Sequence, residues 1–332
     1  VHDVIKGIEP HDSQERFESL GVTVIRDEAR FISPHEVQAG NKTIRARRFV
    51  IATGSSATVP PIQGIEDVTV YTNENIFENT TLPSHLAIIG GGPIGMEMAQ
   101  AHRRLGAKVT VFEMFNVLSK DDPDLASVVI DHFKKEDITL HENTSIAHID
   151  KLGEGGRLHF EKDGKGDTLE ASHILVAAGR KANVDSLNLE AAGVVYDHRG
   201  IKVDDRLRSS QKHIFAIGDV AGGMQFTHVA GYHAGIVIRN ALFRLPAKAK
   251  THATPWVTYT DPEIANVGMT EAQAREQFDE DSIRILTWPF AENDRARAER
   301  VTDGLVKVIT TKRGKILGAG MVGPHAGELI QP

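Results

Sequence analysis

The sequence predicts an α/β fold built on parallel sheets in three layers, followed by a separate α+β domain. Three observations predict it. Short apolar runs at 86–89 and 109–112 flank a glycine-rich turn and a helical repeat, as in buried parallel strands joined by a helix. Two further apolar runs, at 49–52 and 174–178, end in small residues or a glycine. Beyond residue 250 the pattern changes to helices and alternating strands without such a turn.

Composition excludes several classes of protein. The 332 residues include 38 Lys+Arg against 45 Asp+Glu, so the net charge is −7. An acidic chain without basic blocks argues against a nucleic-acid partner and against an anionic membrane surface. No run of 18 apolar residues predicts a membrane span, and no leader predicts a signal peptide, so a cytoplasmic location is expected. With no cysteine, the chain has no disulfide, thiolate metal site or cysteine nucleophile of its own.

The first 84 residues are expected to be part of a nucleotide-binding domain. Residues 1–54 are interpreted as strands and a short helix, ending in the apolar run that stops at Thr53-Gly54. Residues 55–83 are interpreted as a connection, because Pro60-Pro61 is incompatible with regular structure.

The second domain, 85–180, carries the clearest pattern. Pro93 suits the first turn of a helix that runs to Leu105, and Gly106 suits its C-terminal end. A further helix is expected over 124–135. Strands are expected at 86–89, 109–112, 138–140, 145–151, 157–162 and 173–178.

The chain is then expected to return to the first domain over 181–250 and to close with a partial domain at 251–332. Phe215 to Asp219 forms another strand that ends in a glycine, and a helix is expected over 230–242. In the last domain Thr270 begins a capping box for a helix that reaches Phe278. The predicted strands there are 256–259 and a hairpin of 305–311 with 316–322.

An internal repeat supports the α/β assignment. Residues 49–55 resemble 174–180 in residue type, each an apolar strand that ends in small residues and glycine. The match suggests two copies of one dinucleotide-binding architecture, although seven positions also match by chance.

Gly90, Gly92 and Gly95 form a GxGxxG turn between the strand and the helix. Gly90 permits the tight turn, Gly92 lets the backbone approach a pyrophosphate, and Gly95 lets helix and strand pack closely. The helix N-terminus then offers free N–H groups to phosphates. Glycine-rich turns also arise for packing alone, but here strand, helix and a later carboxylate fall in the order that dinucleotide binding requires.

That carboxylate is Glu113, which ends the second strand 18 residues after Gly95. A carboxylate at this spacing accepts from the ribose hydroxyls and repels a 2′-phosphate, and no arginine follows in 114–116, so NAD is favoured over NADP. Glu113 as a solvated strand end is the alternative. Asp219 suits a ribityl or phosphate-linked group, but an N-cap is the commoner role of such an aspartate.

The sixteen histidines show no metal-binding spacing, so no metal site is predicted. His228 and His233 lie five residues apart, which does not place them on one helix face; structural or solvated histidines are the interpretation. The charged run 294–300 is interpreted as a solvated loop or helix face.

Taken together and in order, these motifs resemble the pyridine nucleotide–disulfide oxidoreductases, nearest to dihydrolipoamide dehydrogenase and mercuric reductase. The resemblance covers the whole chain. The motifs that carry it are 52–55, 90–97, 178–180 with Asn183, 216–220, 260–268 and 318–328.

The resemblance implies a homodimer with Rossmann-like FAD- and NAD-binding domains and a C-terminal dimerisation domain, in which NADH and a disulfide-type or related acceptor exchange electrons through FAD. The implied NAD site comprises Gly90, Gly91, Gly92, Pro93, Ile94, Gly95, Glu97, Glu113, Ile146 and Gly179. The implied FAD contacts are Thr53, Gly54, Ser55, Asp219, Gln225, Phe226, Thr227 and His228, with Asp219 on the ribityl chain. Glu97 is also expected near the flavin.

Three family features are missing. A first GxGxxG is expected before Val1, and a C-terminal His-x-His-Pro segment beyond Pro332, while the Cys-x-x-x-x-Cys pair is absent. The chain is therefore interpreted as a fragment without a catalytic residue of its own, inactive alone. A nucleotide-binding module without turnover, or an NADH-dependent mercuric or quinone reductase-like relative, is the alternative.

Overall fold

The computed structural model describes residues 1–162 and 164–331, and the chain divides into two compact units. The first unit joins 1–56 to 181–249, and the second joins 57–180 to 250–332. Residues 57–84, which the sequence assigns to the first domain, group with the second unit. The reason is that strand β6 (Val70–Tyr71) adds in parallel to the edge of β13 (His173–Val176).

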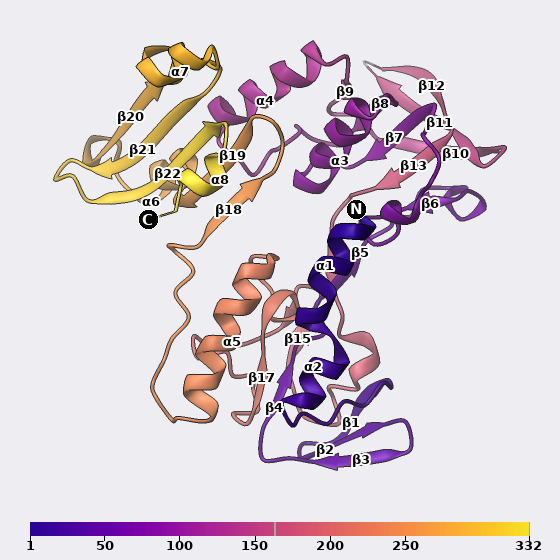
Figure 1. Cartoon of the computed structure of the whole chain (residues 1–332), viewed down its shortest axis with the longest axis vertical. Helices are drawn as coiled ribbons and strands as arrows, with labels where there is room; N and C mark the ends of the chain where they lie inside the picture. The colour runs from indigo at the N-terminus through magenta and orange to yellow at the C-terminus, as the bar shows by residue number, and fades with distance from the viewer. Residues whose placement is uncertain (163, 332) are drawn as a thin grey trace. The chain divides into compact units, whose positions relative to one another are not determined.

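The first unit is built on a parallel pair, β4 (Phe49–Ile51) and β17 (Ile214–Ala216), with helix α5 (Thr227–Ala241) (Figure 1). Its N-terminal part has two helices where one short helix was expected, because Ser13 caps a new helix by accepting from the backbone N–H of Arg16. The remaining elements are α1 (His2–Asp12), α2 (Gln14–Ser19), the meander β1 (Ala29–Ser33), β2 (Glu36–Ala39) and β3 (Lys42–Arg45), and the pair β15 (Tyr196–Asp197) and β16 (Gly200–Ile201).

Alternation along the strands builds the core of this unit. Ile214 and Ala216 of β17 pack with Ile51 of β4 in one cluster of buried residues. Phe215, between them in sequence, points to the opposite face and packs against Ile236 of α5. Strand β17 is thus buried on both faces, as its continuous apolar sequence predicts, whereas Val50 of β4 is exposed.

The second unit contains a five-stranded parallel sheet in the order β6-β13-β7-β8-β9. The sequence predicts these strands except β6, whose two residues are too few to show a pattern. The helices expected between strands are confirmed as well. The observed bounds are β7 (His85–Ile89), α3 (Pro93–Arg104), β8 (Lys108–Phe112), α4 (Pro123–Lys135) and β9 (Thr139–His141).

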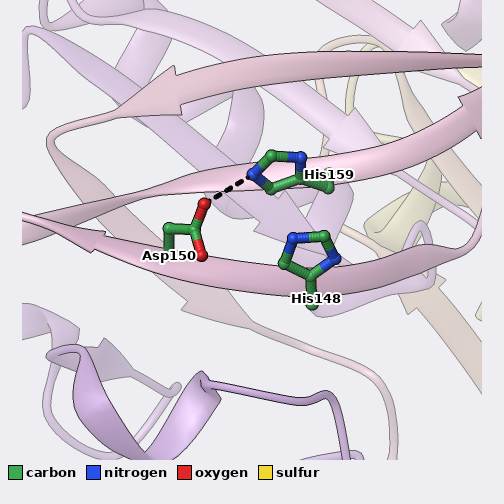
Figure 2. Close-up of side chains that lie close together, drawn as sticks. All are labelled: His148, Asp150 and His159. Atoms are coloured by element: carbon green, nitrogen blue, oxygen red, sulfur yellow. Dashed lines mark hydrogen bonds and ion pairs between the residues drawn. The ribbon is translucent and has the colours of Figure 1, made fainter.

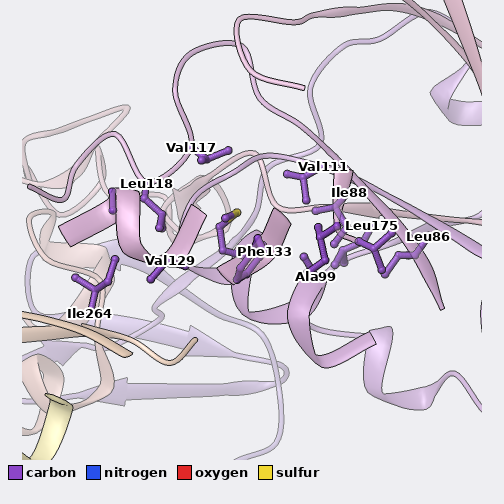
Figure 3. Close-up of a cluster of buried hydrophobic side chains, with 14 of the residues drawn as sticks. Leu86, Ile88, Ala99, Val111, Val117, Leu118, Val129, Phe133, Leu175 and Ile264 are labelled. Carbon is purple, nitrogen blue, oxygen red and sulfur yellow. The ribbon is translucent and has the colours of Figure 1, made fainter. Parts of the chain in front are cut away.

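Each face of the parallel sheet has its own covering layer. Leu86 and Ile88 of β7 pack with Ala99 of α3 and Phe133 of α4 (Figure 3). Ala87 and Ile89 point to the other face, which an antiparallel meander covers. The meander consists of β10 (Ile146–Leu152), β11 (Gly155–Lys162) and β12 (Lys165–Ala171). The fold is three-layered as predicted, with helices on one side of the sheet and a meander on the other.

The C-terminal part of this unit has the predicted α+β character. An antiparallel sheet runs in the order β18-β19-β22-β21-β20, and the Thr270 capping box begins α6. The charged run 294–300 forms the exposed helix α7. The bounds are β18 (Pro255–Thr258), β19 (Glu263–Gly268), α6 (Glu271–Gln277), β20 (Ile283–Pro289), α7 (Asp294–Glu299), β21 (Leu305–Thr311), β22 (Ile316–Gly323) and α8 (Ala326–Leu329).

Short elements complete the chain. Two three-residue strands, β5 (Ser55–Ala57) and β14 (Arg180–Ala182), lie in sequence at the unit boundaries. Single 3₁₀ turns are found at Ile65–Asp67, Ile76–Glu78, Asp185–Leu187, Gly218–Ala221, Glu280–Ser282 and Phe290–Glu292. Within residues 1–162 and 164–331 no helix has the length and apolar character that crossing a bilayer requires.

Candidate functional site

The strand order of the second unit reverses direction between β7 and β13, which makes a topological switch point there. The chain leaves β7 toward β8 on one side, and the strand on the other side of β7 is β13, which comes much later in sequence. Ligands of open parallel sheets bind outside the carboxyl ends of the strands at such a point. The glycine turn 90–95 follows β7 here, and Gly179 follows β13 after Ala177 and Ala178.

The three glycines of the turn have different structural reasons. Gly90 has φ +114°, and a Cβ on it would lie 2.4 Å from the carbonyl oxygen of Ala177. A Cβ on Gly95 would lie 1.9 Å from the carbonyl oxygen of Gly90, so helix and strand contact each other closely here. A Cβ on Gly92 would meet nothing within 4 Å. Packing therefore explains Gly90 and Gly95 but not Gly92, which leaves open space at the start of the helix.

The N-terminus of α3 has free donors at this position. Gly92 is its N-cap residue with φ −76° and ψ −177°, and no described side chain caps it. Pro93 occupies the first helical turn, where its missing N–H costs nothing. The first backbone N–H groups after it, on Ile94 and Gly95, have no partner within the helix. Uncapped donors and the helix dipole together favour an anion such as a pyrophosphate.

Glu113 is part of the turn rather than a solvated strand end. Its Oε2 accepts from the backbone N–H of Gly91 at 2.7 Å, and its Oε1 accepts from the N–H of Phe115 at 3.0 Å. A Cβ on Gly91 would lie 2.6 Å from Cγ1 of Val117, so this glycine also packs against the loop after β8. The carboxylate predicted to meet the ribose thus lies beside the glycine turn.

The other residues predicted for the NAD site lie on neighbouring elements of this unit. Gly179 has φ +117°, open space around its α-carbon, and a carbonyl that accepts from the N–H of Thr58 at 2.9 Å. Ile146 is the half-buried first residue of β10. Their roles in binding stay predictions.

Glu97 lies on α3 and bonds to the C-terminal part of the same unit. Its Oε1 accepts from the backbone N–H of Tyr259 at 2.9 Å. Burial raises the pKa of the Glu97 carboxyl, and the bond from Tyr259 opposes that shift only in part. Carboxyl groups with a shifted pKa are common at functional sites.

We expect Glu97→Gln to be at least as stable as the wild type at pH 7, because the amide keeps an acceptor for Tyr259 without a buried charge. The folded protein holds the Glu97 proton more tightly than the unfolded chain, so ionisation costs stability as the pH rises past the unfolded value of about 4.3. The advantage of the variant should shrink as the pH approaches 4. Urea denaturation at pH 7 and pH 4 measures the difference in unfolding free energy between the variant and the wild type. A difference that favours the variant less at pH 7 than at pH 4 would contradict the raised pKa of Glu97.

In the first unit, four of the residues predicted to contact FAD lie beyond the carboxyl ends of β4 and β17. Ser55 Oγ donates to Oδ2 of Asp219 at 2.5 Å, across 164 residues of sequence. Gly54 has φ +68° and open space where a Cβ would be. Thr53 Oγ1 donates to the carbonyl of Asn183 at 2.7 Å. Asp219 lies in the first turn of the 3₁₀ helix Gly218–Ala221 and is not its N-cap.

The predicted contacts Gln225, Phe226, Thr227 and His228 lie at the start of α5. The helix begins at Thr227, three residues before the expected start, and Phe226 is an N-cap without a side-chain cap bond. The rings of Phe226 and His228 stack with centroids 5.4 Å apart. The 15-residue helix therefore presents a second uncapped N-terminus.

His233 on the same helix is structural, as interpreted from the sequence. Its Nδ1 accepts from the N–H of Gly218 at 3.2 Å, and burial lowers its pKa, which keeps the ring neutral and able to accept. Sequence reasoning did not assign Asn183 a role at the site. Its side chain donates to the carbonyl of Thr53, and its N–H to that of Gly54. The only sequence signal for Asn183 was its place beside residues 178–180 in the family motif.

Comparisons with known proteins identify the family of the chain. Residues 7–234 match the model of the family described as pyridine nucleotide-disulphide oxidoreductase, and residues 254–332 match the dimerisation domain of that family. The chain belongs to this family. Its members bind FAD and use NAD(P)H as the pyridine nucleotide.

Relatives of known activity are similar over nearly the whole chain. A mercuric reductase of Bacillus cereus is 36% identical over 316 residues, which are 94% of this chain and 50% of that protein. A dihydrolipoyl dehydrogenase of Geobacillus stearothermophilus is 33% identical, over 93% of this chain and 66% of that protein. The chain thus spans about half the length of the mercuric reductases it matches.

A solved structure shares the fold. The HOCl-induced flavoprotein disulfide reductase RclA from Escherichia coli aligns with a TM-score of 0.85 and 32% identity, over 95% of this chain and 74% of that one. The family resemblance inferred from the motifs and the predicted α/β fold with a dimerisation domain are both confirmed.

Proposed function

We propose that the chain is the NAD-binding part, together with a portion of the FAD-binding part, of an oxidoreductase that passes electrons from NADH through FAD to a disulfide-type or related acceptor. The family assignment supports the two cofactors. The open position of Gly92 at the uncapped start of α3 is the observation that carries the proposal. A pyrophosphate placed there would accept from the first N–H groups of the helix.

Glu113 favours NAD over NADP within this site. Its carboxylate lies beside the turn, held by Gly91, where an adenosine ribose would donate its hydroxyls. A 2′-phosphate would meet this negative charge instead, and residues 114–116 contain no arginine that could pair with it.

The first unit offers a matching surface for part of FAD. The Ser55–Asp219 pair and the open Gly54 lie beyond the ends of two parallel strands. Helix α5 begins a few residues after Asp219 in the sequence, and its N-terminus has no side-chain cap bond. When bound, the flavin supplies the redox chemistry, accepting a hydride equivalent from NADH. The task of these residues is to hold and orient it: Asp219 would accept from a ribityl hydroxyl while Ser55 fixes the carboxylate.

The acceptor and the assembly are proposed more broadly. Relatives are named for lipoyl and mercuric substrates, and the 332 residues contain no cysteine that could react with either. A homodimer through the C-terminal part is supported by the dimerisation-domain match. A cytoplasmic location stays a prediction.

A nucleotide-binding module without turnover is the second candidate, favoured by the absence of cysteine. The two candidates differ in flavin. After expression and addition of FAD, the oxidoreductase part should retain flavin absorbance through gel filtration, although weakly, and should bind NADH. NADH binding without any flavin would favour the module, and failure to bind either nucleotide would contradict both.

We expect Glu113→Gln to narrow the preference for NADH over NADPH about tenfold, because the amide oxygen still accepts from Gly91, although the bond from Phe115 is lost, and the side chain no longer repels a 2′-phosphate. Fluorescence titration with NADH and with NADPH measures the ratio of the two dissociation constants. Glu263→Gln is the matched control, since Glu263 Oε2 also accepts from a glycine N–H, that of Gly327, at 2.8 Å. An unchanged ratio in Glu113→Gln, or the same change in the control, would contradict the role of Glu113.

A further inference from the structure

Two histidines and an aspartate lie together on the outer face of the meander β10–β12. Between Arg157 and Glu161 the residues of β11 alternate between exposed or half-buried and buried. Leu158 and Phe160 point inward to the core beneath the parallel sheet, and His159 points outward. On β10, Ile149 points inward, so its neighbours on either side point outward with His159.

Strand pairing brings the three together. His148 lies directly opposite His159 in the antiparallel register, and Asp150 follows two residues later on the same face. His159 Nε2 and Asp150 Oδ2 are 2.8 Å apart, and the two imidazole rings stack with centroids 3.9 Å apart. One ligand atom from each residue can be chosen such that all lie within 4.8 Å of one another. Figure 2 shows the three side chains gathered above the two strands.

We propose that His148, Asp150 and His159 bind a divalent transition-metal ion of the zinc class. Two imidazole nitrogens and one carboxylate oxygen form a donor set that suits Zn²⁺, Co²⁺ or Cu²⁺ and does not suit Ca²⁺ or Mg²⁺, which prefer oxygen alone. Bonds of about 2.0–2.2 Å to one tetrahedral ion would place the donor atoms roughly 3.3 Å apart. From the present arrangement the two stacked rings would turn toward a common ion to reach this geometry. The proton between His159 Nε2 and Asp150 then leaves to solvent, and water occupies the remaining coordination position.

The surroundings leave these ligands available. Arg157 lies opposite Asp150 in the register and interacts with it electrostatically. Its guanidinium forms its ion pair with Oε1 of Glu170 on β12, at 2.6 Å. The Asp150 side chain is 58% exposed, which gives an ion access, and that of His159 is 27% exposed, which restricts its rotation. The site is therefore accessible and partly preorganised.

Residue spacing along the chain does not indicate this cluster, and the expectation of no metal site rested on that spacing alone. His148 and His159 are eleven residues apart and join only through the turn between β10 and β11. A bound ion would cross-link these two strands and so stabilise the meander that covers one face of the parallel sheet.

Metal titration of the purified chain tests the proposal. Co²⁺ should produce a visible absorption band that saturates at one ion per chain and is displaced by Zn²⁺, and Zn²⁺ should raise the melting temperature. Asp150→Asn and His159→Gln should each weaken Co²⁺ binding at least tenfold while the metal-free proteins melt within a few degrees of the wild type.

His35→Gln is the matched control. His35 stacks on His213 with centroids 4.3 Å apart, but His213 Nε2 contacts the carbonyl of Pro34 and not a carboxylate. This variant should bind Co²⁺ as the wild type does. The absence of a saturable band, or equal binding by the wild type and by both site variants, would overturn the proposal.

Discussion

Alanine at Gly92 is expected to weaken NADH binding at least tenfold and to leave the free energy of unfolding within about 0.5 kcal/mol of the wild type. A Cβ there meets no protein atom within 4 Å, and φ of −76° suits any residue. The space it would occupy is the space proposed for the pyrophosphate. The variant therefore separates binding from packing.

Gly95→Ala is the matched counterpart of Gly92→Ala, because its main effect should be on stability and not on the nucleotide site itself. The added Cβ would lie 1.9 Å from the carbonyl oxygen of Gly90, so α3 must move away from β7. We expect a loss of about 3 kcal/mol of stability, with binding lost through the fold. Chemical denaturation and NADH fluorescence on both variants measure the two effects. Normal binding by Gly92→Ala, or wild-type stability of Gly95→Ala, would contradict the assignment of the two glycines.

Lys307→Ala is expected to cost about 3–5 kcal/mol of stability, because it leaves the buried carboxylate of Asp122 without its cation. Lys307 lies on β21 with a side chain only 3% exposed, and its Nζ bonds Asp122 at 2.7 Å, Asp124 at 2.6 Å and Glu271 at 2.9 Å. Asp122 and Asp124 begin α4, and Glu271 begins α6. One ammonium thus joins two helix starts to the C-terminal sheet.

The pH dependence of this cluster follows from its charges. Burial alone would lower the pKa of Lys307, but the three carboxylates outweigh it and raise the pKa, so its contribution persists through neutral pH. The bond from Lys307 lowers the pKa of Glu271 below its usual value. The stability that Glu271 contributes is therefore present above about pH 4.3 and is lost as the pH falls below it.

Urea denaturation at pH 7 and pH 3 checks both statements. The difference in unfolding free energy between the wild type and Lys307→Ala should be largest at pH 7 and smaller at pH 3, because the stability that the Glu271 carboxylate contributes is lost as the pH falls. Lys312→Ala is the control, since Lys312 is 55% exposed and lies 3.8 Å from an exposed Asp281. It should change stability by less than about 0.5 kcal/mol. A gap that grows on acidification would disprove the account of the cluster.

Patterns along the chain predicted the elements that bury a regular face. The hairpin of β21 and β22 and the strand–turn–helix of β7 and α3 appear within a residue or so of the expected bounds. Strand β12 was missed because most of Lys165–Glu170 is exposed, so no apolar alternation marks it. Its place is set by pairing with β11, which is a tertiary interaction that a single segment does not encode.

The same distinction separates the predicted and the missed parts of the candidate sites. Gly90, Gly92 and Gly95 are adjacent in sequence, so a linear motif contains their geometry. The bond between Ser55 and Asp219 spans 164 residues and depends on the parallel pairing of β4 with β17. Likewise, His148 and His159 become neighbours only through strand register. Residue spacing along the chain therefore predicts binding turns made of neighbouring residues well, and clusters of residues distant in sequence poorly.

A crystal structure of the protein with NAD⁺ tests the central claim most directly. We predict that the pyrophosphate lies at Gly92 and accepts hydrogen bonds from the first N–H groups of α3, with the adenosine ribose hydroxyls on Glu113. Density for the nucleotide elsewhere on the protein, with the start of α3 left to solvent, would contradict the account.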